Sequence, residues 1–324
     1  MTNLKFSVGY WVYGPMPDRF LSSGYKENLN LEKRLEQIAK TPGLSGVEIP
    51  FGQLLKIDDI EKIKQKIENF GLSISSLGAN VTSDPKWALG SLSNPDKKIR
   101  REAIEIIKNV MDAAYYLNVD TVNLWMGQDG FDYPFEVDYS LIWKYLVDGL
   151  SECASYRPEI KLSVEYKKME PRVHLITNSA AKAVLLVKEV DKPNLGVTLD
   201  FGHALLGGEN PSESVLLLSK FKKLFHLHLN DNYGDWDWDM AVGLNNWWLL
   251  IEFCYWLIEL NYNGWLVLDL FPYRNKAEKI CATSIESFKR AWTIAKSLDR
   301  ALVKENFKEH SSLEVFNLLL KYKA

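Results

Sequence analysis

Short apolar runs alternate with longer amphipathic segments along almost the whole chain. Eight runs have the length and composition of buried strands: residues 5–12, 46–50, 73–78, 121–126, 161–167, 196–201, 224–229 and 265–271. Helix-period stretches lie between them, among them residues 31–39, 60–70, 97–117, 142–156, 179–190 and 247–260. Eight strands, each followed by a helix, predict a (β/α)8 TIM barrel of the α/β class. An open doubly wound sheet is the alternative, but no glycine-rich phosphate turn follows the first strand.

The alternation of strands and helices fills residues 1–299, which we expect to form one catalytic barrel domain. Residues 300–324 continue as one or two helical segments after the eighth unit and predict a C-terminal helical extension. The extension could cover the bottom of the barrel or pack on a partner subunit, and the sequence leaves both arrangements open.

Composition narrows the range of partners. A net charge of −3 gives no reason to expect a nucleic-acid partner, which usually requires a basic face. The chain has no apolar run of the ~18 residues that a membrane helix needs, and its first residues do not resemble a signal peptide. The three cysteines lack metal-binding spacing and are expected to be reduced thiols. We expect a cytoplasmic protein that binds no membrane and forms a homo-oligomer, either a dimer or a tetramer.

A carboxylate or an imidazole stands near the end of each of the last four predicted strands: Glu165, Asp200, His228 and Asp269. Because successive strand residues face opposite sides, each of these side chains lies opposite the bulky aliphatic residues of its strand. In a (β/α)8 barrel the inward face at the strand ends is where active sites form. Three carboxylates and one imidazole therefore predict a site for Mn²⁺, Mg²⁺ or Co²⁺.

A second group of candidate ligands follows the seventh strand. Asp237 and Asp239 can project together from an acidic loop, and His203 lies three residues after Asp200. With a carboxylate shared from the first site, they would hold a second ion ~3.5–4 Å from the first. Asp235 could replace one of the two aspartates through a shift of register, or it could cap a helix.

Lys167 lies two residues beyond Glu165 and therefore on the same face of its strand. A lysine in this position can polarise a carbonyl group or stabilise a developing alkoxide. The alternative is a salt bridge to a neighbouring acid.

Several segments resemble the xylose isomerase-like superfamily and, within it, the rhamnose isomerase-type sugar isomerases. The segments are EYKKMEP at 165–171, DFGH at 200–203, HLND at 228–231, WDWD at 236–239, LGSLSNPD at 89–96 and WMGQDG at 125–130. The WDWD segment is similar to the WDxD loop of xylose isomerase. Together the matching segments span roughly residues 75–275, which is most of the predicted barrel.

The resemblance implies a role for each candidate residue. Glu165, Asp200, His228 and Asp269 would bind a structural metal, while His203, Asp237 and Asp239 would bind a catalytic metal. Glu165, Lys167 and Asp269 would take part in catalysis, with Lys167 at the substrate C1 oxygen. Trp125, Lys167, His203 and Phe271 would contact the substrate, and Trp125 would form an apolar wall that excludes water.

These roles predict a metal-dependent sugar isomerase. It would interconvert an unphosphorylated aldose and its ketose by a 1,2-hydride shift, with two divalent ions, Mn²⁺ first and Co²⁺ or Mg²⁺ as alternatives. The nearest alternative is a ketose 3-epimerase of the tagatose 3-epimerase type, which uses one metal and two acid–base carboxylates.

Two more distant classes are a nuclease of the endonuclease IV type and a non-catalytic sugar-binding barrel. The nuclease needs histidines on early strands, whereas all five histidines here follow residue 170. The same absence removes the histidine that helps xylose isomerases to open the sugar ring. Glu48 and Asp129 are the candidates for that task, or else act as acceptors for a substrate hydroxyl or as structural partners.

Overall fold

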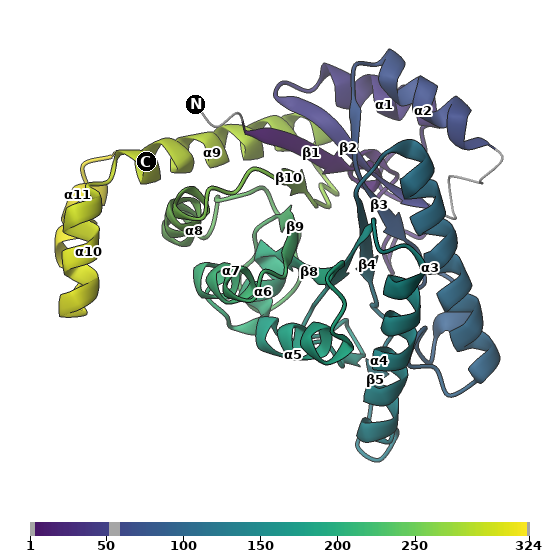
Figure 1. The fold of residues 1–324 in the computed structure, drawn as a ribbon. Coiled ribbons are helices and arrows are strands. Elements are labelled where there is room, and N and C mark those ends of the chain that lie inside the picture. Colours follow the sequence, from purple (N-terminus) through teal and green to yellow (C-terminus); the bar gives the residue numbers. More distant parts are fainter. Residues whose placement is uncertain (1–3, 52–58, 323–324) are drawn as a thin grey trace.

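Eight parallel strands form a closed barrel in which the first strand pairs with the last (Figure 1). The computed structural model describes residues 4–51 and 59–322. The barrel strands are β1 (Lys5–Gly9), β2 (Leu44–Phe51), β3 (Ser73–Ala79), β4 (Thr121–Trp125), β6 (Lys161–Glu165), β8 (Leu195–Asp200), β9 (Leu224–Leu229) and β10 (Trp265–Leu268). The predicted (β/α)8 TIM barrel is therefore confirmed.

The helices surround this barrel. They are α1 (Leu31–Lys40), α2 (Ile60–Asn69), α3 (Lys97–Leu117), α4 (Tyr139–Tyr156), α5 (Ala180–Val190), α6 (Phe201–Gly207), α7 (Pro211–Lys220), α8 (Trp247–Glu259) and α9 (Ala277–Ser297). Side-chain caps fix several of their starts: Asp96 accepts a hydrogen bond from the backbone of Lys98, and Ser179 accepts one from that of Lys182. A small antiparallel sheet of two strands, β5 (Gly130–Phe131) and β7 (His174–Leu175), lies outside the barrel.

The first strand ends earlier than the sequence pattern predicts. β1 stops at Gly9, and Tyr10–Tyr13 form a short 3-10 helix, η1. A Cβ atom at Gly9 would lie 2.3 Å from the indole ring of Trp11, so glycine allows that ring to fold back against the strand end. We expect the loop that follows the second strand, residues 51–55, to help shape the substrate pocket, but residues 52–55 lie outside the described part of the chain.

The two faces of the barrel differ in polarity. The outward-facing residues are aliphatic and pack under the helices; Val47, Val164 and Leu199 are examples, all fully buried. Inward-facing residues are mostly polar and form hydrogen bonds with one another. For example, Thr198 Oγ1 donates to Asn123 Oδ1 at 2.7 Å. The barrel interior can therefore hold charged groups, because its polar side chains supply the hydrogen-bond partners that buried polar groups need.

The predicted C-terminal extension forms α10 (Arg300–Glu309) and α11 (Leu313–Leu319), which lie at the side of the barrel near α8 (Figure 1). Phe307 stacks on Trp256 with ring centroids 5.5 Å apart, and Phe316 lies 5.3 Å from Trp248. Residues 323–324 of the extension are outside the described range. No helix among the described residues is both long enough and apolar enough to cross a membrane.

Candidate metal centre and active site

A cavity of about 510 Å³ opens where the barrel strands end. The predicted site residues that line it are Glu165, Lys167, His203, His228, Asp237, Asp239, Asp269, Trp125 and Phe271. Asp200 is the exception, because it is fully buried and lies behind the cavity wall. The sequence prediction thus placed nearly every chosen residue at one cavity.

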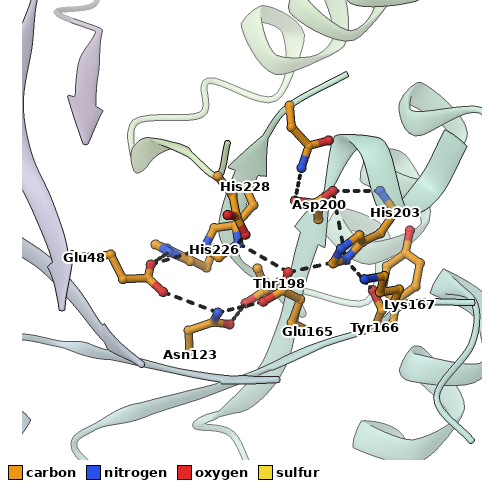
Figure 2. A network of polar contacts seen from close by, with 12 residues as sticks. Glu48, Asn123, Glu165, Tyr166, Lys167, Thr198, Asp200, His203, His226 and His228 are labelled. Atoms are coloured by element: carbon orange, nitrogen blue, oxygen red, sulfur yellow. Dashed lines mark hydrogen bonds and ion pairs between the residues drawn. The ribbon is translucent and has the colours of Figure 1, made fainter. Parts of the chain in front are cut away.

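The four predicted strand-end ligands come together as a compact group. Glu165, Asp200, His228 and Asp269 each offer a ligand atom, and these atoms all lie within 4.8 Å of one another. His228 Nδ1 lies 3.3 Å from Glu165 Oε1 and 3.4 Å from Asp269 Oδ2. Figure 2 shows Glu165 and His228 facing each other across this group. The residues come from the ends of β6, β8, β9 and β10, so barrel closure itself assembles the group.

The charges of this group fit a bound cation. Burial raises the pKa of Asp200 to about 6. Burial also opposes ionisation of Glu165, but the positive His228 beside it lowers the pKa of Glu165 to about 2. Despite its burial, the adjacent carboxylates raise the pKa of His228 well above its usual value. His228 Nδ1 is buried without a hydrogen-bond partner and faces carboxylate oxygens. This position therefore requires either a proton or a metal ion.

Asp200 is held in place by two donors. Its Oδ1 accepts from the backbone N–H of His203 at 2.7 Å, and its Oδ2 accepts from Asn230 Nδ2 at 2.9 Å. Asn230 also donates to Asp239 Oδ1 at 3.2 Å, so one amide connects the two candidate sites. A Cβ atom at Gly202 would lie 1.7 Å from Asn230 Oδ1. Glycine in the DFGH segment therefore leaves the space that Asn230 needs.

The second candidate group is only partly brought together. His203 Nε2 lies 3.5 Å from Asp237 Oδ2, and His203 Nδ1 lies 3.3 Å from Glu165 Oε1. Asp237 Oδ1 is buried without a hydrogen-bond partner. Burial, followed by the charge of Asp237, raises the pKa of Asp239 well above its usual value. In the described part of the chain, however, His203, Asp237 and Asp239 do not form a compact ligand set like the strand-end group.

Lys167 lies in a buried cluster of ions. Its Nζ is 2.6 Å from Asp237 Oδ2, pairs also with Glu170, and lies 5.3 Å from the centre of the Trp125 ring. Burial opposes its charge, but Asp237 and Glu170 raise the pKa of Lys167. Lys167 is therefore an ammonium group that faces the cavity, and the salt bridge considered as its alternative role is also present.

Three acids that the sequence left open differ in their surroundings. Asp235 lines the cavity, and its Oδ1 accepts from Trp238 Nε1 at 2.9 Å. Asp129 lies away from the cavity lining and accepts hydrogen bonds from Ser91 and Ser93, which is a structural role. Glu48 reaches the cavity, but its carboxylate is bonded to interior residues.

Two contacts to the strand-end group were missed by sequence reasoning. Asn123 Nδ2 donates to Glu165 Oε2 at 2.8 Å, and Trp11 Nε1 donates to Asp269 Oδ1 at 2.6 Å. Strand alternation could have found Asn123, because it lies two residues before Trp125 and so faces inward. Trp11 lies beyond the end of β1, where alternation gives no signal.

The fold and the site together define a (β/α)8-barrel protein with a candidate divalent-metal centre at the carboxyl ends of its strands. The chain belongs to the xylose isomerase-like TIM barrel family, whose model matches residues 35–291. The expected superfamily is therefore confirmed.

Individual relatives resemble the chain over most of its length. A xylose isomerase of Thermus thermophilus is 24% identical over 336 residues, which cover 98% of this chain and 84% of the relative. The solved structure of a D-tagatose 3-epimerase-like protein has a TM-score of 0.70 and 22% identity, covering 90% of this chain and 98% of its own. An L-ribulose 3-epimerase has a TM-score of 0.71 and 14% identity, covering 90% and 96%. At these identities the solved structures establish the fold alone.

Proposed function

We propose that this chain is a metal-dependent aldose–ketose isomerase that acts on an unphosphorylated sugar by a 1,2-hydride shift. One observation carries the proposal: the ionic cluster of Lys167, Asp237 and His203 lines the same cavity as three members of the strand-end group, Glu165, His228 and Asp269. A one-metal epimerase would have no task for this cluster. The Thermus relative, named as a xylose isomerase, supports the same reaction class.

The strand-end group would hold one divalent ion, and His203, Asp237 and Asp239 would contribute to a second. Bound Mn²⁺, Co²⁺ or Mg²⁺ would polarise two adjacent substrate oxygens. Lys167 would donate a hydrogen bond to the C1 oxygen and stabilise its negative charge, because the lysine is charged and almost fully buried. Trp125 and Phe271 would shield the reacting carbons from water.

Cavity charges support an unphosphorylated substrate. Among the described residues that line the cavity, Lys167 is the one lysine or arginine, and it is already paired with Asp237 and Glu170. A phosphate group would meet the surrounding carboxylates without an unpaired lysine or arginine side chain to bind it. A cytoplasmic homo-oligomer, either a dimer or a tetramer, stays a prediction.

A ketose 3-epimerase is the second candidate. It is favoured by the finding that, of the two ligand groups predicted from the sequence, the strand-end group is compact in the described residues and the group of His203, Asp237 and Asp239 is not. Against it, both oxygens of Asp269 face other groups: Oδ1 accepts from Trp11, and Oδ2 lies 3.4 Å from His228. Asp269 therefore has a partner at each oxygen, and it is one methylene shorter than the glutamate that an epimerase of this type would be expected to use there.

Turnover in D₂O separates the two reactions. The purified protein is stripped of metal, reloaded with Mn²⁺, Co²⁺ or Mg²⁺, and assayed against a panel of aldoses and ketoses. A hydride shift gives the isomer with little deuterium at C1 or C2. Epimerisation through proton removal places deuterium at C3 and retains the ketose. Deuterium at C3 without aldose formation would overturn the isomerase proposal, as would the absence of both metal binding and turnover.

The variant Asp237→Asn tests the second group directly. We expect isomerisation to fall by ~100-fold or more, because the variant removes a charge from both the lysine pair and the candidate metal ligands. An epimerase that relies on the strand-end ion should largely keep its activity. Asp235→Asn, in the same loop, is the matched variant: if it abolishes isomerisation while Asp237→Asn does not, Asp235 is the ligand.

A further inference from the structure

One carboxylate oxygen beneath the metal centre accepts three hydrogen bonds. Glu48 Oε2, from β2, lies 2.5 Å from Ser76 Oγ, 2.9 Å from His226 Nε2 and 3.1 Å from His228 Nε2. All four side chains are buried, and Glu48 itself is 1% exposed. Figure 2 shows Glu48 at the opposite end of the polar network from Lys167. Burying a charged carboxylate this deeply costs folding free energy unless hydrogen bonds from fixed partners offset it.

This arrangement determines which nitrogen of His228 carries a proton. An ionised carboxylate can only accept, so His226 and His228 each donate from Nε2. Burial opposes ionisation of Glu48, but His228 and His226 hold the pKa of Glu48 well below its usual value. In neutral His228 the lone pair is then on Nδ1, the nitrogen that faces Glu165 and Asp269. The tautomer selected by Glu48 is therefore the one that can bind a metal ion in the strand-end group.

The second oxygen of Glu48 faces another support of the same group. Asn123 Nδ2 lies 3.5 Å from Glu48 Oε1 and donates to Glu165 Oε2 at 2.8 Å. Glu48 thus lies behind two of the four strand-end ligands, His228 directly and Glu165 through Asn123. Both contacts reach across the barrel interior from β2, which supplies no strand-end ligand itself.

We propose that Glu48 is a positioning residue of the metal centre: it holds His228 in the tautomer and orientation that present Nδ1 to the ion. The inference rests on the proposed metal-dependent function. Carboxylate partners of metal-binding histidines commonly change metal affinity by ~10–100-fold when they are removed.

A different role for the same residues is less consistent with their surroundings. Glu48, His226 and His228 are close enough to hold an ion of their own. However, His226 and Ser76 are absent from the cavity lining, and both imidazoles are already hydrogen-bonded to Glu48. It would also have to displace the protons that join both imidazoles to Glu48. Hydrogen bonding satisfies the whole group without an ion.

Titration of the metal-free protein with Co²⁺ tests the proposal in wild type and in Glu48→Gln. We expect the affinity at one site to fall by ~10–100-fold and the visible Co²⁺ spectrum to change, because the amide no longer fixes the Nε2 proton of His228. Asp129→Asn is the matched control, since it also neutralises a buried carboxylate that accepts three hydrogen bonds, and it lies outside the cavity lining. This control should lower the melting temperature and leave both Co²⁺ readouts unchanged.

Glu48→Asp keeps the test usable if Glu48→Gln does not fold. The aspartate retains the charge but is one methylene shorter, so its Co²⁺ affinity should fall below that of wild type. Wild-type affinity and spectrum in the Glu48 variants would overturn the inference, as would an equal loss of affinity in Asp129→Asn. A wild type that binds one more ion than Glu48→Gln would also overturn it and assign a separate metal site. A wild type that binds no metal would instead overturn the proposed function and the inference with it.

Discussion

The indole Nε1 of Trp11 donates a 2.6 Å hydrogen bond to Oδ1 of Asp269, across 258 residues of sequence. Trp11 follows β1 and Asp269 follows β10, the two strands whose pairing closes the barrel. Asp269 is one of the four candidate strand-end ligands, and its other oxygen faces His228. The first unit of the chain therefore fixes the orientation of the last ligand.

Trp11→Phe should weaken metal binding without unfolding the barrel. The variant keeps an aromatic ring against Gly9 but removes a hydrogen bond to a charged group, a bond worth ~1.5–3 kcal/mol. We expect a roughly tenfold or greater loss of Co²⁺ affinity by titration. Trp248→Phe, on the flank at α8, is the control and should bind Co²⁺ like wild type. Equal affinities in Trp11→Phe and wild type would contradict the role given to Trp11.

Gly202→Ala should disrupt both candidate sites at once. The new Cβ would lie 1.7 Å from Asn230 Oδ1, so the amide that bonds Asp200 and Asp239 must move. Overpacking of this kind costs ~1–3 kcal/mol of folding free energy, and chemical denaturation measures it. We also expect Co²⁺ affinity to fall.

The matched control for that substitution is in the same short helix. A Cβ at Gly207 would have its nearest contact at 3.6 Å, with the Glu209 side chain, so Gly207→Ala should be tolerated. If both alanine variants behave alike, helix composition rather than the position of Asn230 determines the effect.

Metal affinity should fall as the pH is lowered. Burial raises the pKa of Asp200 to about 6, and the adjacent acids raise the pKa of His228 well above its usual value. A metal ion must displace the His228 proton over the whole neutral range, and below pH 6 it must displace a proton from Asp200 as well. The affinity should therefore change by about one log unit per pH unit above pH 6 and more steeply below it. Co²⁺ titrations between pH 5 and 8 would measure this slope, and a flat profile would contradict it.

Glu152 should stabilise the protein at neutral pH but not in acid. It joins α3 to α4 through Arg101 and Lys108, whose hydrogen bonds lower the pKa of Glu152 from 4.5 to about 2. A carboxyl group whose pKa is lower in the folded state contributes stability that is fully present above pH 4.5. This stability is lost as the pH falls toward 2. The side chain is 40% exposed, so solvent screening limits the contribution to less than about 1 kcal/mol. Urea unfolding of Glu152→Gln should show a deficit at pH 7 that shrinks in 1 M salt and disappears near pH 2.

The sequence predicted the barrel and the strand-end group because both depend on local periodicity. Alternation along β6 or β9 places Glu165 and His228 inward whatever the rest of the fold does. The links between distant strands, such as Glu48 to His226, require the strand order and the register of the closed barrel. Loop residues were harder still, because no periodicity fixes the position of Asp239 relative to His203.

Closure of the barrel by β1 and β10 also governs when the strand-end group can form during synthesis of the chain. The chain leaves the ribosome from its amino terminus, so β1 and Trp11 emerge long before β10 and Asp269. Until β10 arrives, β1 has an unpaired edge and the strand-end group lacks one carboxylate. A nascent chain can therefore complete the strand-end group only in one late step, after most of its length has been translated.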